Sequence, residues 1–409
     1  MRILYLSHYF PPEGNAPASR VHELCKRWVR LGHQVSVITC APNVPDGKVY
    51  QGYHNRLSQR EWVDGIEVIR VWTYIAANQG TVRRIANYLS YAVTATLRAQ
   101  LLPRPDIIVA TSPQFFCGWA GVLSKWLSGR PLMLEIRDLW PESIVAVGAM
   151  RQPQLLALLE ALELRMYGAA DHITTVGEGY RARLLEKGVP EAKLTVITNG
   201  VDRELYASRP PDRALAARLG VEDRFVCCYA GTIGMASGLD IVLRAARELR
   251  ARGDTSVCFL LVGEGAVRAE LQAQAEREGL DNVIFTGRLP KADMPAVLSV
   301  ADCCLVHLKK TELFETVLPS KLFEALAMRR PVILGVRGDA ARVLEESGGG
   351  LCIEPEDDGA LLEAIERLRG EPGLAQRFGE RGEAHVVGRY DRDRLAGEYL
   401  GVLDDVARG

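Results

Sequence analysis

Short apolar runs alternate with longer amphipathic stretches along almost the whole chain, and this alternation restricts the fold more than any other feature of the sequence. A strand buried on both faces gives a short continuous apolar run, and the amphipathic stretch after it is typical of a helix that covers the sheet. Repetition of this unit builds a parallel sheet with helices on both faces. The pattern therefore predicts an α/β chain with doubly wound sheets.

The apolar runs form two series, each long enough for its own sheet. The strands predicted in the first series are Ile3–Ser7, Gln34–Thr39, Ile66–Val71, Asp106–Ala110, Leu132–Ile136, His172–Val176 and Leu194–Ile197. Those predicted in the second series are Phe225–Ala230, Val257–Val262, Val283–Thr286, Cys303–His307, Pro331–Leu334 and Leu351–Ile353. A chain of 409 residues exceeds the ~250–300 residues at which a single core stops growing, so two domains are expected.

The stretch Ser208-Arg209-Pro210-Pro211-Asp212 has the composition of a stiff, exposed linker. We therefore predict a first domain over residues 1–205 and a second over residues 206–388. Beyond Ile353 the pattern is only helical, and the last predicted helix, Arg392–Ala407, lies in a terminal segment of residues 389–409. This segment is expected to pack back across the junction.

Charge and cysteine usage exclude several classes of protein. The formal net charge of −1 argues against a nucleic-acid partner. The pairs Cys227-Cys228 and Cys303-Cys304 lie in strand-like runs, which is typical of small core residues in a reducing cytosol. The start of the chain has no apolar segment of signal-peptide length, and the uncharged stretch Ile85–Leu97 is shorter than the ~20 residues of a membrane span. A cytoplasmic location is expected.

In each series a loop rich in small residues follows the first strand. These loops are Phe10–Pro17 and Ala230–Gly238. In parallel sheets, ligands bind at the carboxyl ends of the strands, where free N–H groups at helix starts favour an anion. The plainer interpretation is that any turn from strand to helix favours glycine. Taken together, the two loops favour a ligand site.

A sharper cluster is the run Leu318–Ala327. Pro319 near a first helical position leaves the N–H groups of Ser320 and Lys321 free for a diphosphate, and the Lys321 ammonium adds charge there. Glu324 lies one turn further on the same face, where its carboxylate can accept both hydroxyls of a ribose. The alternative is ordinary capping and surface charge.

With these motifs the chain resembles the family 4 glycosyltransferases of the GT-B fold, which are retaining enzymes that use sugar nucleotides. The motifs that carry the resemblance are Pro11-Pro12-Glu13-Gly14, Thr198–Asp202, Leu261–Gly265, Phe285–Leu289 and the Glu324 helix. The resemblance implies two facing Rossmann-like domains with an interdomain cleft. The N-terminal domain should bind the acceptor and the C-terminal domain the nucleotide sugar.

The same resemblance assigns site residues. Glu324 should hold the ribose. The base and ribose pocket should be lined by Gly263, Gly265, Arg288 and Leu289. The diphosphate should be surrounded by Gly14, Ser320 and Lys321, and the loop residues expected to complete the nucleotide-sugar site are Asn15, Gly231 and Thr232.

The sequence departs from the family pattern at two places. Many relatives have a second glutamate eight residues before the ribose glutamate, at the donor sugar, where this chain has Thr316. This suits a deoxy or acetamido sugar. Relatives also carry an Arg and a Lys in the second glycine loop, where this chain has Thr232 and Ser237, which leaves Lys321 and Arg137 to neutralise the diphosphate.

The stretch Glu135–Ser143, together with Pro319-Ser320-Lys321, resembles a narrower branch that builds bacterial surface polysaccharides and transfers N-acetylated amino sugars such as N-acetyl-fucosamine. Within this stretch Asp138 could orient or deprotonate an acceptor hydroxyl, with Arg137 paired to phosphate. The alternative is that Asp138 caps the following turn. The expected catalytic set is Asp138, Arg137 and Lys321.

No cofactor is expected, and the reaction is predicted to be metal-independent. The string Asp391-Arg392-Asp393 matches the D-x-D pattern of metal-dependent sugar transferases, but it opens a terminal helix, where Asp is a favoured cap. The histidines show no ligand spacing.

The segment of residues 83–130 has a basic excess, because a single acid, Asp106, stands among its cations, which are Arg83, Arg84, Arg98, Arg104, Lys125 and Arg130. With its aromatic and aliphatic residues it could lie on an anionic membrane surface, which would suit a lipid-linked acceptor at the inner face of the plasma membrane. Alternatively, its helices only cover the sheet of the first domain.

The sequence thus predicts transfer of an N-acetylated or deoxy amino sugar from a UDP-sugar, UDP being favoured by family frequency, to a lipid-linked or saccharide acceptor. An epimerase of sugar nucleotides with the same fold, or a non-catalytic sensor, would share the nucleotide pocket. A dinucleotide-dependent oxidoreductase is disfavoured, because Gly263-Glu264-Gly265 is followed by Arg268 where the third glycine should stand.

Overall fold

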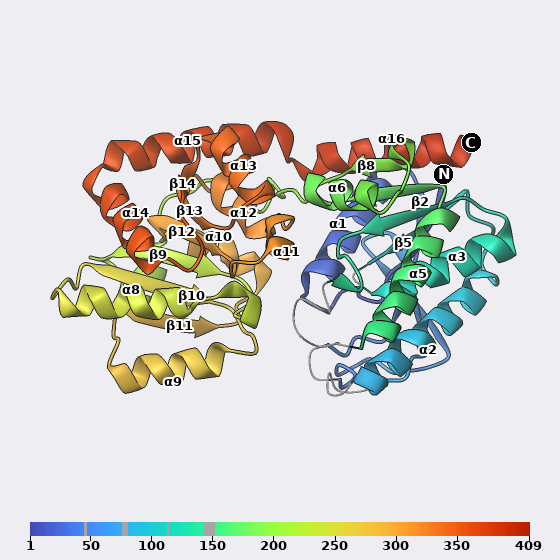
Figure 1. The fold of residues 1–409 in the computed structure, drawn as a ribbon, viewed down its shortest axis with the longest axis horizontal. Coiled ribbons are helices and arrows are strands. Elements are labelled where there is room, and N and C mark those ends of the chain that lie inside the picture. Colours follow the sequence, from blue (N-terminus) through green and yellow to red (C-terminus); the bar gives the residue numbers. More distant parts are fainter. Residues whose placement is uncertain (45–46, 76–80, 113, 143–151) are drawn as a thin grey trace. The chain divides into compact units, whose positions relative to one another are not determined.

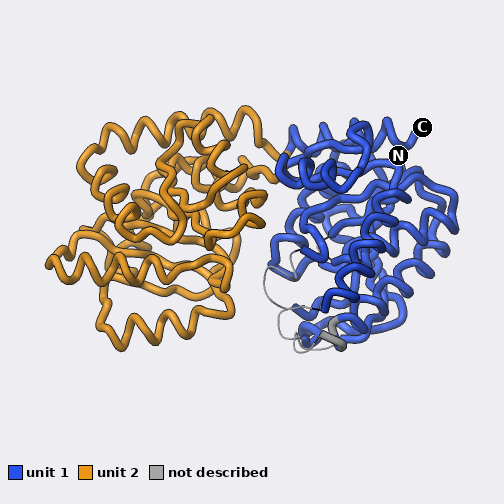
Figure 2. Tube along the Cα trace, viewed as in Figure 1, with its two compact units in different colours: residues 1–198, 393–409 blue, residues 199–392 orange. Residues whose placement is uncertain are grey.

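The computed structural model describes residues 1–409 except 45–46, 76–80, 113 and 143–151, and it omits the side chains of residues 81, 82 and 84. Ser143, the last residue of the motif that begins at Glu135, therefore lies outside the described residues. The chain divides into two compact units, shown in Figure 2. Unit 1 comprises residues 1–198 and 393–409, and unit 2 comprises residues 199–392.

Unit 1 contains one sheet with the strand order β3-β4-β2-β1-β5-β6-β7-β8 over the described residues (Figure 1). Its strands are β1 (Arg2–Leu6), β2 (Gln34–Cys40), β3 (Ser58–Val63), β4 (Ile66–Val71), β5 (Ile107–Thr111), β6 (Leu132–Ile136), β7 (His172–Thr175) and β8 (Leu194–Val196). Its helices are α1 (Ala16–Arg30), α2 (Thr81–Ala99), α3 (Phe115–Ser128), α5 (Pro153–Ala169), α6 (Glu178–Glu186) and α16 (Arg392–Arg408), with a 3₁₀ turn at Glu191–Lys193.

Unit 2 contains a second sheet with the order β11-β10-β9-β12-β13-β14. Its strands are β9 (Phe225–Ala230), β10 (Val257–Val262), β11 (Val283–Gly287), β12 (Cys303–His307), β13 (Val332–Gly335) and β14 (Gly350–Cys352). Its helices are α7 (Arg213–Leu219), α8 (Asp240–Ala251), α9 (Arg268–Glu278), α10 (Met294–Ser299), α11 (Glu312–Glu315), α12 (Ser320–Ala327), α13 (Asp339–Ser347), α14 (Asp358–Gly370) and α15 (Pro372–Arg389), with 3₁₀ turns at Met235–Ser237 and Lys291–Asp293.

The two predicted sheets and all their predicted strands are confirmed, each to within two residues. The prediction missed β3, which pairs antiparallel with β4 at the edge of the first sheet. This edge strand alternates exposed and half-buried positions and contains no continuous apolar run. The alternation that identifies buried parallel strands therefore gave no signal for it.

The parallel strands bring their carboxyl ends to one edge of each sheet, and the strand order reverses between β1 and β5 in unit 1 and between β9 and β12 in unit 2. Such a reversal splays the adjoining loops apart, and ligands of open α/β sheets bind there. The loops predicted as ligand sites follow β1 and β9, so each lies at the reversal of its own sheet.

The segment predicted as a linker, around Ser208–Asp212, lies within unit 2. Its surroundings explain why. The side chains of Val201, Tyr206 and Leu215 are buried in the core of unit 2, and Asp212 caps α7 by accepting the N–H of Leu215. The compact part of unit 2 therefore begins at residue 199, seven residues before the predicted boundary at 205/206.

The C-terminal helix α16 supplies part of the core of unit 1. The ring of Tyr399 packs against Trp28 with 5.2 Å between centroids, and the Trp28 indole donates a hydrogen bond of 3.0 Å to the carbonyl of Ala396. At the start of the helix, Arg27 pairs with Asp393. The Cys227-Cys228 and Cys303-Cys304 pairs are buried free thiols, as expected of core residues.

Candidate functional site

Two glycine-containing loops of unit 2 cross in close contact at the carboxyl ends of β9 and β10. The N–H of Gly231 donates to the carbonyl of Val262, and the N–H of Ile233 donates to that of Glu264, both at 2.9 Å. A Cβ on Gly263 would lie 1.9 Å from the carbonyl oxygen of Gly231, and one on Gly265 would lie 2.2 Å from that of Ile233. No side chain fits at either glycine, so the crossing itself requires both.

Lys321, the second residue of α12 and a residue predicted to lie at the diphosphate, reaches this loop. Its ammonium lies 3.7 Å from the ring centroid of Tyr229, a cation–π contact, and is close enough to Gly231 to limit any side chain there. The Tyr229 hydroxyl donates to the carbonyl of Thr232 at 2.7 Å. Ser320 opens the same helix after Pro319. Within unit 2 the structure thus brings together Gly231, Thr232 and Lys321.

Glu324 lies one turn further along α12. Burial raises the pKa of its carboxyl, and the cations of Arg392 and Lys291 and a hydrogen bond from Tyr206 counter only part of this rise. The carboxylate therefore lies at the edge of the core, with a hydroxyl and positive charges around it. This environment suits a group that accepts ligand hydroxyls and whose pKa lies above its ordinary value.

The remaining predicted residues of unit 2 differ in their surroundings. Arg288 is exposed directly after β11, and Leu289 is half-buried against the core. The hydroxyl of Thr316, at the end of α11, donates to the carbonyl of Leu313 at 2.8 Å. The Thr316 hydroxyl therefore already donates its proton within the chain, and its oxygen can still accept a hydrogen bond.

Ser237 is one of the two loop residues at which the sequence departs from the family pattern. It is buried, and its carbonyl contacts His307. His307, the last residue of β12, lies between the carbonyl of Ser237, 2.8 Å from Nδ1, and the N–H of Glu356, 2.9 Å from Nε2. These partners assign the proton to Nδ1, and burial lowers the pKa of His307, so the ring is neutral. The imidazole thereby fixes the end of the glycine loop.

In unit 1 the loop that contains Gly14 is held by hydrogen bonds to the segment after β2. The buried carboxylate of Glu13 accepts the N–H groups of Asn43 and Val44 at 2.9 and 3.1 Å. Asn15 caps α1 by accepting the N–H of Ala18 at 2.9 Å, which is a structural role for a residue predicted to bind nucleotide sugar. A Cβ on Gly14 would meet nothing within 4 Å, so this glycine is not required by packing.

Arg137 and Asp138 follow β6, next to the end of β5. The hydroxyl of Ser112 accepts the backbone N–H of Arg137 at 2.7 Å and that of Asp138 at 3.2 Å. One hydroxyl therefore shapes the turn that presents both side chains. The two predicted residues are neighbours in the sequence, and Ser112 holds both of their backbone N–H groups.

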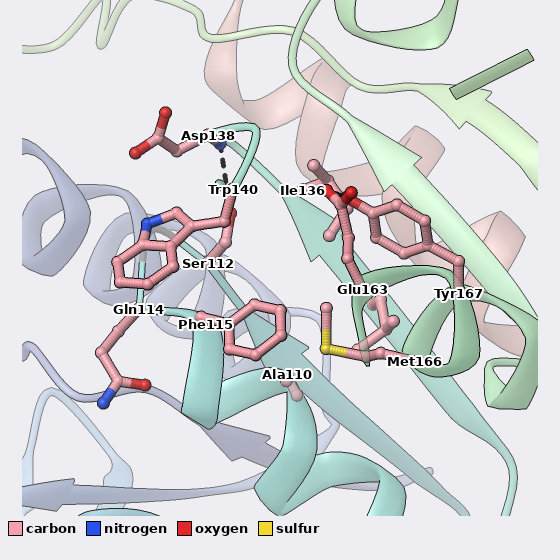
Figure 3. A pocket seen from close by; sticks show the side chains of 12 residues that line it. Ala110, Ser112, Gln114, Phe115, Ile136, Asp138, Trp140, Glu163, Met166 and Tyr167 are labelled. Atoms are coloured by element: carbon pink, nitrogen blue, oxygen red, sulfur yellow. Dashed lines mark hydrogen bonds between the residues drawn. The ribbon is translucent and has the colours of Figure 1, made fainter. Parts of the chain in front are cut away.

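A pocket in unit 1 lies beside Asp138 (Figure 3). Trp140 stacks on Phe115 with 5.6 Å between centroids on one side, and residues of α5 form the other. Among these, Glu163 accepts hydrogen bonds of 2.6 Å from both Tyr167 and Lys187, which counter the effect of burial in raising its pKa. The pocket is thus mainly apolar, with a carboxylate on either side.

Several residues of these sites were not identified from the sequence. Tyr229 lies in an apolar strand and Glu163 in an amphipathic helix, and neither sequence context distinguishes it from an ordinary structural residue. The sequence around Glu135 does contain a signal, because an acid inside the otherwise apolar strand Leu132–Ile136 must have a buried partner.

Among the described residues, no group of three or more His, Cys, Asp or Glu side chains is placed to hold a metal ion. The carboxylates of the D-x-D string face arginines: Asp391 lies 3.5 Å from Arg203, and Asp393 lies 2.5 Å from Arg27.

Two family models match the chain, one over each half. The model described as Glycosyl transferase 4-like domain matches residues 15–200, and the model described as Glycosyl transferases group 1 matches residues 224–370.

Individual relatives agree with these matches. A protein of Escherichia coli (strain K12) named as a colanic acid biosynthesis glycosyl transferase, WcaI, is 28% identical over 377 residues, which cover 89% of this chain and 91% of the relative. A GDP-mannose-dependent alpha-(1-6)-phosphatidylinositol monomannoside mannosyltransferase of Mycolicibacterium smegmatis is 30% identical over 223 residues, which cover 53% of this chain and 58% of the relative.

Among solved structures, Anabaena Alr3699/HepE in complex with UDP and glucose is similar with a TM-score of 0.74 and 19% sequence identity, covering 98% of this chain and 99% of that chain. At this identity the likeness concerns the fold, and it shows that the chain has the GT-B fold.

The glycine crossing predicts opposite outcomes for two alanine substitutions. Gly265→Ala should lower the free energy of unfolding by about 1–3 kcal/mol, because the new Cβ overlaps the carbonyl of Ile233 and the backbone must shift. Gly14→Ala should leave the unfolding midpoint in urea unchanged, because its Cβ enters open space. Equal midpoints for Gly265→Ala and wild type would contradict the crossing geometry.

Proposed function

We propose that this chain, which has the GT-B fold, is a family 4 glycosyltransferase that transfers a sugar from a UDP-sugar, with retention of configuration, to a lipid-linked or saccharide acceptor during polysaccharide synthesis. The observation that carries the donor assignment is the cluster in unit 2. There the Lys321 ammonium lies on the Tyr229 ring beside Gly231, and the Glu324 carboxylate lies one turn further along α12.

The spacing of this cluster matches the chemistry of a sugar nucleotide. A diphosphate at the start of α12 would meet the helix N-terminus and Lys321, while the ribose would lie at Glu324. Lys321 and the helix provide positive charge in the protein itself, which supports a metal-independent reaction. The solved structure of HepE contains UDP and glucose, whereas the mycobacterial relative is named as GDP-mannose-dependent. Proteins similar to this chain thus differ in their nucleobase, and uracil is the base that we propose here.

The proposed donor sugar is an N-acetylated or deoxy amino sugar. Its support is the replacement of a carboxylate by Thr316, whose hydroxyl already donates to the carbonyl of Leu313 and whose oxygen can accept an amide N–H. The proposed acceptor group lies at Asp138, beside the apolar pocket of unit 1. The name of the Escherichia coli relative supports a bacterial surface polysaccharide as the product.

The donor pocket is tested by the response of UDP affinity to pH. Because burial raises the pKa of Glu324, its carboxylate should take up a proton as the pH falls through this raised pKa, and UDP affinity should fall with it. Glu324→Gln should weaken UDP binding by about 10–100-fold near neutral pH, the loss of a hydrogen bond to a charged group, and should remove this pH dependence. Calorimetry without divalent metal measures both, with GDP, ADP and TDP as comparisons. Preferred binding of GDP would reject the UDP assignment.

The acceptor base is tested by Asp138→Asn. This variant keeps the size of the side chain and removes the proton acceptor, so turnover should fall by about 10²–10⁴-fold while UDP affinity stays unchanged. UDP release is measured with a panel of UDP-N-acetylamino sugars and polyprenyl diphosphate-linked saccharides. Asp64→Asn, at an exposed position of the same unit, serves as the control. Turnover of Asp138→Asn at the wild-type rate would exclude this role.

We also propose that unit 1 attaches to anionic membrane surfaces through α2 and α3. Both predicted roles of α2 have support: Tyr91 and Ala95 are buried in the core, while another face carries an exposed apolar stripe at four-residue spacing. The stripe comprises Leu89, Val93 and Leu97 of α2 and Leu101 in the turn after it, and Trp126 and Leu127 are exposed on the adjacent α3. No helix of the described residues is long and apolar enough to cross a membrane.

The stripe predicts the effect of a charge at its centre. Leu97 is 62% exposed, so Leu97→Glu should leave the fold intact, yet it should reduce binding to phosphatidylglycerol vesicles at low salt by about tenfold or more. Leu164→Glu places the same charge at a 45% exposed leucine of α5 and should bind like wild type. Flotation measures the bound fraction. Failure of the wild-type protein to bind at low salt would remove the proposal.

A further inference from the structure

The carboxyl end of β6 contains a buried carboxylate, Glu135, both oxygens of which accept hydrogen bonds. Glu135 accepts Arg20 Nε at 2.8 Å on one oxygen, and the hydroxyls of Tyr5 and Thr111 at 2.7 Å each on the other. Burial alone would raise the pKa of Glu135, but these partners and the charge of Arg137 hold it below its ordinary value. The group is ionised, and its partners come from α1, β1 and β5.

Arg20 is equally well satisfied. Besides Glu135, its guanidinium donates to the carbonyls of Ile197 and Thr198 at 2.9 Å each. Arg20 and Glu135 therefore form an ion pair in which the hydrogen bonds are 2.7–2.9 Å long and the two charges cancel.

Arg137 is the second guanidinium near this single carboxylate, two residues after Glu135. Its Nε and Nη1 atoms are buried and have no hydrogen-bond partner in the described part of the chain. Burial lowers the pKa of Arg137, Glu135 opposes this, and Arg20 adds to it. An arginine nevertheless keeps its proton in a protein. Among Arg20, Glu135 and Arg137 there is thus one positive charge more than negative, and two donors of the half-buried Arg137 are shielded from water.

A buried charge with unpaired donors is among the most costly features of a folded chain, and the chain offers a simple remedy, since an apolar residue at position 137 would remove it. A trapped water could accept a hydrogen bond from Nε or Nη1 but could not balance the charge. The partner that satisfies both requirements is an anion from outside the chain. A planar guanidinium suits the bidentate contact that phosphate oxygens make.

We propose that Arg137 forms a phosphate subsite in unit 1, held in place by the Arg20–Glu135 ion pair and by Ser112. The substrate assignment rests on the proposed function. Asp138, the next residue, lines the pocket at which the acceptor is proposed to bind, so a phosphate on Arg137 would lie within one residue of the proposed base. The phosphate belongs either to the sugar nucleotide or to a lipid-linked acceptor.

Thermal unfolding of the full chain with and without inorganic pyrophosphate tests the subsite. Pyrophosphate should raise the Tm of wild type and of Lys321→Gln, which removes the ammonium at the start of α12, and the shift should be smallest in Arg137→Gln, where only the Lys321 site remains. Arg137→Lys retains the charge and should retain a smaller shift. A full shift in Arg137→Gln, or none in wild type, overturns the proposal.

The unliganded variants give a second, independent readout. A guanidinium that is merely structural would be missed on removal, and the Tm would fall. For an uncompensated buried charge, Arg137→Met and Arg137→Gln should instead raise the Tm, by about 2 °C or more, while abolishing turnover. A lower Tm in both variants would show that the chain itself satisfies this arginine and would overturn the subsite.

Calorimetry with UDP and uridine then distinguishes the two sources of phosphate. If Arg137→Gln weakens UDP at least tenfold and leaves uridine unchanged, the subsite takes the donor diphosphate. If UDP affinity is unchanged, it takes the phosphate of the acceptor. Absence of UDP binding to wild type, with the pyrophosphate shift intact, would refute the donor assignment and leave the subsite standing.

Discussion

The ion pair between Arg20 and Glu135 is the constraint on which unit 1 depends. Its hydrogen bonds join α1 to β6, reach β1 and β5 through Tyr5 and Thr111, and end on the carbonyls of Ile197 and Thr198, where the chain leaves the unit. A pair buried this deeply gains little net stability over well-packed apolar side chains. What it provides is a fixed geometry at the point where the strand order reverses, beside the guanidinium of Arg137.

Unit 2 achieves the same rigidity with its backbone. The loops after β9 and β10 are joined by main-chain hydrogen bonds, and glycines at 263 and 265 allow carbonyls to approach where a Cβ would collide. His307, a neutral imidazole held between Ser237 and Glu356, closes the far end of the loop. Because the loop carries no cation of its own, the charge is delivered by Lys321 from α12, and the Tyr229 ring holds that ammonium without neutralising it.

Features that depend on local residue type could be predicted from the sequence, whereas features that depend on contacts between distant residues could not. The strands were predictable because parallel strands buried on both faces must be apolar runs, whereas β3, with Trp62 exposed at the edge of the sheet, is free of that requirement. In the site, the glycines and Lys321 could be identified since a backbone crossing and a helix start each permit few residue types. Tyr229, Glu163 and the partners of Glu135 could not, because their roles arise from contacts between residues far apart in the sequence. Asn15, expected at the nucleotide, is explained by the capping of α1.

The same reasoning indicates which half of the reaction can diverge. The proposed donor site consists of crossing backbones and a helix terminus, which tolerate almost no substitution at the glycines but suit only features that all sugar nucleotides share, a diphosphate and a ribose. The site of unit 1 is built from side chains: the Phe115–Trp140 stack, Asp138, Glu163 and Arg137. None of these residues lies in a strand of the sheet, so they can change more readily than the glycines while the Arg20–Glu135 pair keeps the turn after β6 in place. Substrate differences among chains with this architecture should therefore concentrate in the side chains around that turn, while the ion pair beneath it stays fixed.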